Sequence, residues 1–198
     1  MPIYPTVYTF LTKNDMVVRV RPLRAEDAPY LVDLFENMSQ DSRYSRFLQT
    51  LENIEMERVW SSAEQIAQGV AVNSHGLLAF CDTAERPDVP VAAARYIRLD
   101  SGQAEIGISV RDDMQGIGIG SRLLGLLFDD GRAEGIQQMV AIIHNNNIVI
   151  WRLLRGLGYP ITRRQDGNMT EVTLDVSDPP GWEDTAVDYS PEPQLTGY

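Results

Sequence analysis

The residues best suited to chemistry are the glycines of a short turn between an apolar run and an amphipathic run. Gly116, Gly118 and Gly120 follow the apolar segment Ile106–Val110 and open a run with helical periodicity. The first N–H groups of a helix lack partners within the helix, and the helix dipole is positive there, so the turn is a candidate anion site. Glycine also removes side chains that would block a phosphate. The turn therefore predicts phosphate binding, with tight strand–helix packing as the alternative.

Two common phosphate-binding loops do not fit this turn. A P-loop requires a Gly-Lys-Ser/Thr ending, and no lysine follows these glycines. A dinucleotide-binding turn requires GxGxxG, whereas the spacing here is GxGxG. The pattern that does fit is Gln115-x-x-Gly118-x-Gly120. It resembles the pyrophosphate-binding turn of the GNAT superfamily of acyl-CoA-dependent N-acyltransferases.

Further segments extend this resemblance over about residues 16–176. Asn147 opens an apolar run that ends in Leu-Gly-Tyr at 157–159, as the next helix of the superfamily does. Three earlier segments are similar to those of the Pat-type protein lysine acetyltransferases: RPLRAED at 21–27, LFENMS at 34–39 and SRYSRF at 42–47. The resemblance implies an α/β GNAT fold, in which helices flank a central twisted sheet that is mixed but mostly antiparallel.

The resemblance also assigns binding roles to particular residues. The implied cosubstrate is acetyl-CoA, and no cluster of His, Cys or Asp has the spacing of metal ligands, so no metal is expected. Backbone groups of Ile108 and Val110, on a bulged strand before the turn, would contact the pantetheine and thioester. The residues that would surround the pyrophosphate are Gln115, Gly116, Gly118, Gly120 and Ser121. Asn147 would hydrogen-bond the pantetheine and cap its own helix. Arg122 and Arg152 are candidates for phosphate or adenosine contacts, with ordinary solvated arginines as the alternative.

Glu105 is the candidate general base. An amine must be neutral to attack a thioester, so a protonated amine must first lose its proton. Glu105 lies ten residues before Gln115, where Pat-type enzymes carry their glutamate, inside the apolar sequence QAEIGISV. Partial burial there is expected to favour proton uptake by the carboxylate. The alternatives are a solvated glutamate without a role, or a base among Asp112, Asp113 and His144.

One position departs from the resemblance. Many GNAT enzymes carry a tyrosine seven residues after the helix-opening asparagine, where it protonates the departing thiolate; here Leu154 stands at that position. Tyr159, in the Gly-Tyr ending, is expected in the core. A CoA thiolate leaves without great difficulty because thiols are fairly acidic. Catalysis can therefore survive the change, while a catalytically silent homologue stays an alternative.

The elements expected to position these residues alternate between strands and helices. A hairpin is expected over Thr6–Leu11 and Met16–Arg21, and Glu26 and Asp27 are the capping candidates for the first helix. Helices are expected over Arg24–Asn37, Gly118–Glu134 and Ile148–Leu157. The mixed stretch Ser42–Gly69 is expected to form a further helical region, with Ile54–Gln68 as its most helical part. Further strands are expected over Gly76–Thr83, Val89–Leu99, Ala104–Val110, Met139–His144 and Glu171–Val176. Together they indicate one domain over residues 1–176.

Composition narrows the cellular setting and the partners. The 198 residues carry a formal charge of −11, which disfavours nucleic acid and is compatible with a cationic acceptor. No long uncharged apolar run or signal-peptide core is present, so neither a membrane partner nor secretion is expected. The single cysteine, Cys81, suits the cytoplasm and reads as an inert core thiol. Residues 177–198, with five acids and no Lys or Arg, are expected to form a flexible tail.

The function that follows is acetyl transfer from acetyl-CoA to a primary amine. A protein lysine is the first candidate acceptor, and a small-molecule amine is the second. A non-catalytic acyl-CoA sensor and an assembly domain with a purely structural glycine turn remain as alternatives from other functional classes. The expected partner is the amine acceptor, and a homodimer is left open.

Overall fold

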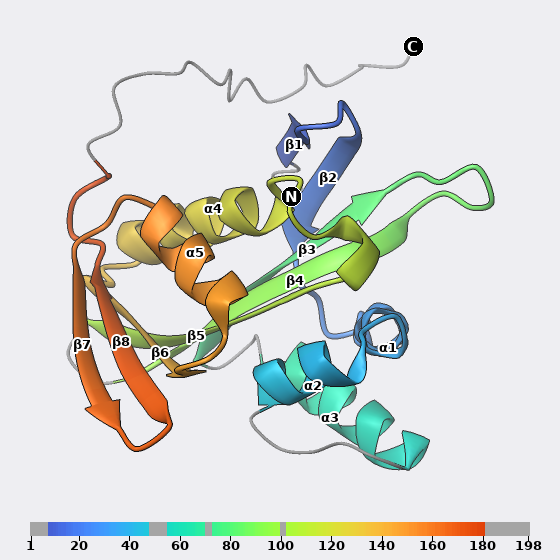
Figure 1. Ribbon diagram of the computed structural model, residues 1–198. Coiled ribbons are helices and arrows are strands. Elements are labelled where there is room, and N and C mark those ends of the chain that lie inside the picture. Colours follow the sequence, from blue (N-terminus) through green and yellow to red (C-terminus); the bar gives the residue numbers. More distant parts are fainter. Residues whose placement is uncertain (1–7, 48–54, 70–72, 100–101, 181–198) are drawn as a thin grey trace.

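The structure is a computed structural model that describes residues 8–47, 55–69, 73–99 and 102–180 (Figure 1). Its helices are α1 (Ala28–Glu36), α2 (Gln40–Phe47), α3 (Met56–Gly69), α4 (Ile119–Ala133) and α5 (Ile148–Gly156). Its strands are β1 (Tyr8–Leu11), β2 (Val17–Pro22), β3 (Ser74–Cys81), β4 (Val89–Arg98), β5 (Gln103–Val110), β6 (Gln138–His144), β7 (Ile161–Asp166) and β8 (Met169–Asp175).

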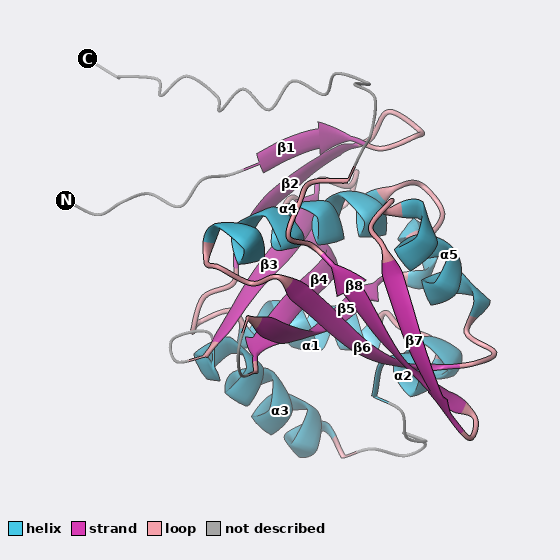
Figure 2. Ribbon diagram, turned by 90° about the vertical axis from the view of Figure 1, so that its left-hand side faces the viewer, coloured by secondary structure: helices cyan, strands magenta, loops and turns pink. Residues whose placement is uncertain are grey.

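The strands form one sheet in the order β1-β2-β3-β4-β5-β6-β8-β7 within the described residues. Every neighbouring pair is antiparallel except β5 and β6, which run parallel. Helices cover both faces of this sheet (Figure 2). The expected class, a mixed and mostly antiparallel sheet flanked by helices, is therefore confirmed.

The two faces of the sheet carry different helices. Helix α4 packs on one face, where its apolar stripe Leu123, Leu124, Leu127 and Phe128 is fully buried against side chains of β3, β4 and β5. Helices α1 and α3 pack on the other face and on each other. The i, i+4 spacing of the α4 stripe is what the sequence predicted for this helix. Because side chains alternate along a strand, neighbouring residues of β5 point to opposite helix layers.

The parallel pair is joined over only part of its length. β5 and β6 pair at three positions, Gln103–Glu105 with Gln138–Val140, although β5 continues to Val110 and β6 to His144. Beyond Glu105, β5 is paired with β4 alone. We call the opening between Ile106–Val110 and Ala141–His144 the β5–β6 split. Backbone groups along this edge of β5 are therefore outside the β5–β6 ladder and can bind a ligand.

One element was indicated only broadly by the sequence, and another lies outside the expectations. Helix α2 overlaps the mixed stretch Ser42–Gly69, but it has no apolar stripe, because most of QDSRYSRF is polar, so periodicity could not place its bounds. Strand β7 (ITRRQD) is exposed along almost its whole length and pairs only with β8. An exposed edge strand has no need of alternating apolar residues, and the sequence therefore carries no strand signal there.

Asp27 corrects the expected capping of the first helix. Asp27 stands at the N-cap position of α1, but its side chain makes no capping bond to the helix. Its buried carboxylate instead accepts two hydrogen bonds from Arg21, at 2.6 and 2.8 Å, and one from the Arg24 backbone at 2.7 Å. Asp27 therefore ties α1 to strand β2, a role that local sequence could not reveal.

The end of the chain falls mostly outside the described residues. Of the expected tail 177–198, the structure describes residues 177–180, where Ser177 bonds back to Asp175 at the end of β8.

None of the helices in the described part of the chain is both long and apolar enough to span a bilayer.

Candidate functional site

The glycine turn has the geometry of an anion site at the start of α4. Gly116 and Gly118 adopt positive φ, at 77° and 100°, and Gly118 is the N-cap residue. The bond from the Arg122 N–H to the Gly118 carbonyl, 3.2 Å, begins the α4 hydrogen-bond ladder. The N–H groups of the three residues before Arg122 lie ahead of this ladder, at the positive end of a 15-residue helix. The turn therefore presents the donors that a pyrophosphate requires.

Gly120 differs from the other two glycines of the turn. It lies inside α4 and is not among the glycines with positive φ. A Cβ at Gly120 would lie 3.3 Å from a methyl group of Leu153 on α5. Gly120 thus permits the close approach of α4 and α5, the packing alternative raised from the sequence. Its expected contact with a pyrophosphate, like that of Ser121, stays a prediction.

Lys13 brings a cation to this turn from a distant part of the sequence. It lies between β1 and β2, and its backbone N–H donates to the Ile117 carbonyl at 2.9 Å. A Cβ at Gly118 would lie 3.8 Å from Cγ of Lys13 and 4.0 Å from its Cε, so the lysine stem lies along the turn. Lys13 is exposed and is the sole lysine in the sequence. Sequence analysis missed it because a lysine next to an Asn-Asp turn carries no signal of contact with residues about a hundred positions later.

Asp112 and Gln115 attach α2 to the beginning of the turn. Asp112 lies in a short 3₁₀ helix (Asp112–Met114) and accepts three bonds: from the Ser39 N–H at 2.8 Å, the Ser39 hydroxyl at 2.9 Å and the Ser42 hydroxyl at 2.7 Å. The Gln115 amide donates to the Ser42 hydroxyl of α2 at 3.5 Å and to the Val110 carbonyl at 3.2 Å. Asp112, which the sequence suggests shapes the turn, holds Ser39 and Ser42 next to it. The pyrophosphate contact expected of Gln115 stays a prediction.

The Asp112 anchor gives a pH-dependent prediction. Partial burial acts to raise the pKa of Asp112, but the hydrogen bonds from Ser42 and Ser39 outweigh it and lower the pKa below 3.8. A depressed carboxyl pKa stabilises the fold above the unfolded-state pKa, and this contribution is lost as the pH falls through the folded-state pKa. Asp112→Asn is expected to cost about 1 kcal/mol of unfolding free energy at neutral pH, a low figure because the carboxylate is exposed and screened. Urea titrations should show this difference between variant and wild type at pH 7 and its progressive loss as the pH is lowered below 3.8. A difference that stays the same as the pH is lowered would contradict the anchor.

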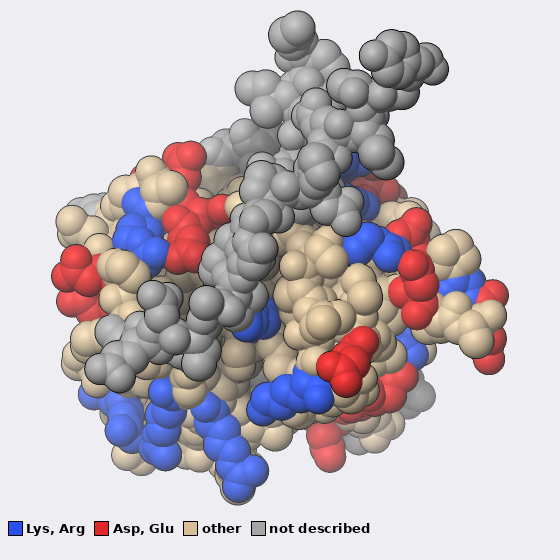
Figure 3. All heavy atoms as spheres, turned by 90° about the horizontal axis from the view of Figure 1, so that it is seen from above, with Lys and Arg blue, Asp and Glu red and all other residues tan. Residues whose placement is uncertain are grey.

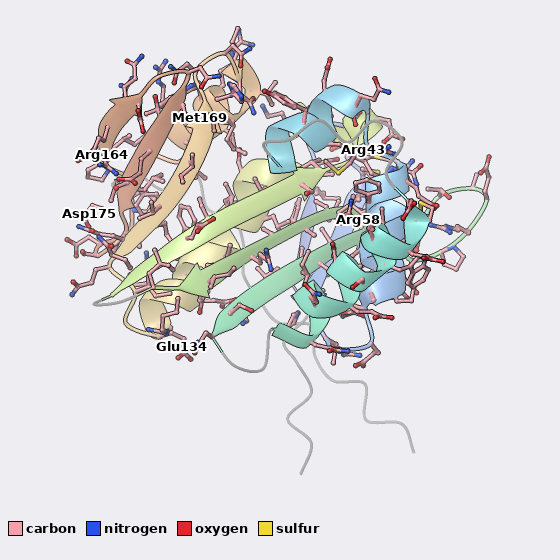
Figure 4. The ribbon with its side chains drawn as sticks, turned by 90° about the horizontal axis from the view of Figure 1, so that it is seen from below. Arg43, Arg58, Glu134, Arg164, Met169 and Asp175 are labelled. Atoms are coloured by element: carbon pink, nitrogen blue, oxygen red, sulfur yellow. The ribbon has the colours of Figure 1, made fainter. Side chains whose placement is uncertain are left out.

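Glu105 stands at the base of the β5–β6 split. It occupies the last position at which β5 pairs with β6, opposite Val140, and it is flanked on β4 by Ile97. Ala104 and Ile106 contribute to the core on the α4 side, so Glu105 points to the other face of the sheet. The expected partial burial is wrong, because the structure leaves Glu105 exposed. Helices α1–α3 gather over the carboxyl-terminal half of β5 and leave its beginning open (Figure 4).

Ile108 and Val110 lie on the free edge of β5 along the split. Their side chains are partly buried against the α4 core. Strand β5 pairs with β4 in unbroken register from Ala104 to Val110, so the bulge implied by the resemblance is absent from this ladder. The Val110 carbonyl already accepts the Gln115 amide. The backbone contacts expected of Ile108 and Val110 stay predictions.

Helix α5 closes the site on the β6 side. The Asn147 side chain caps α5 by accepting from the Ile150 N–H at 3.1 Å, as expected. Leu154, at the position of the missing tyrosine, is fully buried, and Tyr159 is buried in the core as expected. His144, at the end of β6, bonds through Nε2 to the Tyr44 hydroxyl of α2 at 2.8 Å. Helix α2 therefore contacts both sides of the mouth of the split, through Asp112 and through His144.

The residues that remain are two arginines and the single cysteine. Arg122 is half-buried on α4, and Arg152 is exposed on α5. Figure 3 shows Lys and Arg side chains gathered along one edge of the helix-α4 face. Cys81 is buried, and burial raises the pKa of its thiol, which makes it a poor nucleophile. In the described parts of the chain, no group of three His, Cys, Asp or Glu side chains is arranged to hold a metal ion.

Comparisons with known proteins agree with this geometry. A family model described as an acetyltransferase (GNAT) domain matches residues 18–160. An acetyltransferase from Pseudomonas aeruginosa is 26% identical over 158 residues, which cover 78% of this chain and 81% of the relative. An L-methionine sulfoximine/L-methionine sulfone acetyltransferase from Pseudomonas paraeruginosa is 39% identical over 71 residues, 36% of this chain and only 39% of that relative.

Solved structures show the same fold. The GNAT domain of S. lividans PAT matches with a TM-score of 0.72 and 25% identity, over 87% of this chain and 99% of that domain. A Salmonella typhimurium protein solved with its cofactor acetyl-CoA matches with a TM-score of 0.58 and 19% identity, over 85% of this chain and 99% of the other. The fold, the glycine turn and the family model therefore agree on acetyl-CoA as the ligand.

Proposed function

The chain belongs to the GNAT acetyltransferase family and uses acetyl-CoA, and from this premise we propose that Glu105 takes the proton from a primary amine that attacks the thioester. One observation carries the proposal: Glu105 stands at the base of the β5–β6 split, whereas the glycine turn begins α4 on the other face of the sheet. A cosubstrate held at the turn and passing along the split can meet an acceptor on the Glu105 side. The two reactants then approach from opposite faces, and each has its own binding surface.

The residues around the split divide the work of transfer. The turn, with Gly116, Gly118 and the nearby Lys13, offers N–H groups and a cation to the pyrophosphate. The free backbone edge of β5 offers hydrogen bonds to the pantetheine and to the oxyanion that forms during attack. Glu105, exposed at the base of the split, removes the amine proton directly or through a water molecule. The buried Leu154 cannot donate a proton, so the thiolate leaves without a tyrosine acid.

A protein lysine is the first acceptor that we propose. The proposal is supported by the similarity to the GNAT domain of S. lividans PAT and by the net charge of −11, which favours a cationic acceptor. A small amine acceptor is the second candidate. It is supported by the 39% identity over 71 residues to an enzyme named for L-methionine sulfoximine.

A thiol-release assay tests the function. Purified protein with acetyl-CoA should release free thiol when given lysine peptides or small amines, and mass spectrometry should show the acetylated acceptor. Lys13 is the single lysine of the chain, so self-acetylation at lysine can occur at one position only and is easily recognised. A rise in melting temperature with acetyl-CoA but no amine-dependent thiol release would indicate a non-catalytic acyl-CoA sensor instead. No rise in melting temperature with acetyl-CoA would indicate an assembly domain whose glycine turn is purely structural.

Lys13→Met tests the cation beside the turn. Loss of one charge-assisted contact to a phosphate is expected to weaken acetyl-CoA binding about 5- to 30-fold, and Lys13→Arg should restore most of it. Because Lys13 is exposed, the difference should shrink as salt is added. Calorimetry at two salt concentrations measures both effects. If wild type and Lys13→Met bind acetyl-CoA with equal affinity at low salt, Lys13 does not contact the phosphates.

A further inference from the structure

Arg95 is a half-buried cation close to the candidate base. It lies on β4 opposite Gly107 of β5, two residues from Glu105, so the Arg95 and Glu105 side chains share one face of the sheet as diagonal neighbours. Diagonal neighbours have Cα atoms about 7–8 Å apart. Burial lowers the pKa of Arg95, and the Glu105 carboxylate opposes this effect. The guanidinium is thus partly desolvated, and the Glu105 carboxylate acts on it only through space.

The hydrogen-bond donors of Arg95 distinguish it from Arg21 and Arg111, two other partly buried arginines. Arg21 makes two bonds to Asp27, and Arg111 makes two bonds to Asp113. Among the described residues, no hydrogen bond or ion pair is recorded for the Arg95 side chain. A guanidinium has five N–H donors, and those of Arg95 reach solvent, because no buried side-chain nitrogen or oxygen in the described part of the chain lacks a partner. Arg95 therefore has the capacity to bind an anion from outside the fold.

The space next to Arg95 can receive part of a small molecule. A hollow of about 60 Å³ lies between helices α1 and α3 and strands β4 and β5, and Arg95 lines it. Its other walls are mostly apolar, among them Leu31, Leu34, Phe35, Met38 and Ile66. Gly107 and Ser109 of β5 form its floor on the same face as Glu105. The hollow is therefore on the acceptor side of the split, the face seen in Figure 4.

We propose that Arg95 binds a carboxylate of the acceptor, so that the enzyme selects amines that carry a carboxylate close to the reacting nitrogen. This inference rests on the proposed function, because it places the amine at Glu105. Charges then alternate from Glu105 to the ammonium, to the acceptor carboxylate and to Arg95, and each is paired. A planar carboxylate fits the guanidinium through two parallel hydrogen bonds, and its single charge is balanced by one arginine. A dianionic phosphate would leave excess negative charge beside Glu105.

The acceptor carboxylate that Arg95 would bind can come from two sources. One is the α-carboxylate of a free amino acid, whose side chain would enter the apolar hollow. The other is an Asp or Glu side chain next to a lysine in a protein. Both place one carboxylate near one amine, and Arg95 serves both in the same way as a specificity residue.

Matched acceptors and an Arg95→Met variant test the proposal. The acceptors are a set of free amino acids with their amides, and lysine peptides with Glu or Gln beside the lysine. The wild type is expected to favour the carboxylate member of one such pair about 10- to 100-fold in kcat/KM. Arg95→Met should abolish that preference and leave the amide or Gln member nearly unchanged, whereas Arg95→Lys should retain part of it. Binding of acetyl-CoA, measured by calorimetry, should be the same in all three proteins.

Arg58→Met is the control for loss of positive charge on this face. Arg58, labelled in Figure 4, is exposed on α3 and does not line the hollow, so its removal should leave the preference intact. A preference in the amino acid pairs identifies the free amino acid as the source, and a preference in the peptide pairs identifies the acidic neighbour. Equal rates for both members of every pair, or an equal loss on both members in Arg95→Met, would overturn the role of Arg95 while the acetyltransferase function stands. Absence of amine-dependent thiol release with every acceptor would overturn the proposed function and this inference with it.

Discussion

Glu105→Gln is expected to reduce acetyl transfer about 10²- to 10⁴-fold at pH 7, the usual effect of removing one proton-transfer group. Glutamine keeps the size of the side chain but cannot take a proton from the amine. The substitution should leave the fold intact, because Glu105 is exposed and its side chain contributes nothing to the core. Steady-state thiol release with a verified acceptor measures the loss.

The loss of activity in Glu105→Gln should depend on pH in one direction. As the pH rises, a larger share of the acceptor amine is already neutral, so the base is needed less and the deficit should shrink. Affinity for acetyl-CoA should hardly change, because the glycine turn begins the helix on the opposite face of the sheet. A fall in both affinity and turnover would indicate structural damage.

Two neighbouring variants serve as matched controls for Glu105. Asp113→Asn removes an equal charge from the other end of β5, where Asp113 pairs with Arg111. His144→Gln removes the rival base at the end of β6. Both should keep most of the activity. Near wild-type turnover in Glu105→Gln together with a large loss in His144→Gln would show that His144, and not Glu105, takes the proton from the amine.

Gly118→Glu is expected to weaken acetyl-CoA binding about 100-fold or more. Gly118 is the N-cap of α4 with φ at 100°, a conformation that side chains rarely adopt, and its Cβ would point toward the Lys13 stem. A carboxylate there would repel the pyrophosphate and also attract the Lys13 ammonium away from it. Isothermal calorimetry with acetyl-CoA measures the effect.

Two further substitutions separate charge from backbone strain at the turn. Gly118→Ala introduces the strained backbone without a charge, so it should lower the melting temperature but weaken binding less than Gly118→Glu. Gly125→Glu adds the same acid to the middle of α4, at a position where a Cβ meets no atom within 4 Å. It should bind acetyl-CoA almost as wild type does. A folded Gly118→Glu protein with wild-type affinity would show that the turn does not hold the phosphates.

The sequence by itself determined the features that depend on neighbouring residues. The glycines before α4 predicted a turn with free N–H donors, and two of them adopt the positive φ that only glycine takes easily. Asn147 predicted its own helix cap, and the leucines and phenylalanine of α4 predicted the buried stripe. Caps, turns and helix faces form within a few residues, so their patterns stay visible in the linear chain. The bounds of helix α2 and the whole of strand β7 escaped because neither has an apolar pattern.

Only the tertiary structure decided which distant residues meet. Lys13 reaches the glycine turn, Tyr44 reaches His144, and Asp27 holds Arg21 instead of capping α1. The exposure of Glu105 and its place on the face of Arg95 follow from the pairing register of β4 with β5 and from the early end of the β5–β6 ladder. Strand register and helix docking are set by packing of the whole sheet, and a shift of one residue would turn Glu105 to the other face. The acceptor side of this site is therefore a property of the assembled sheet, whereas the phosphate side is already visible in one short turn.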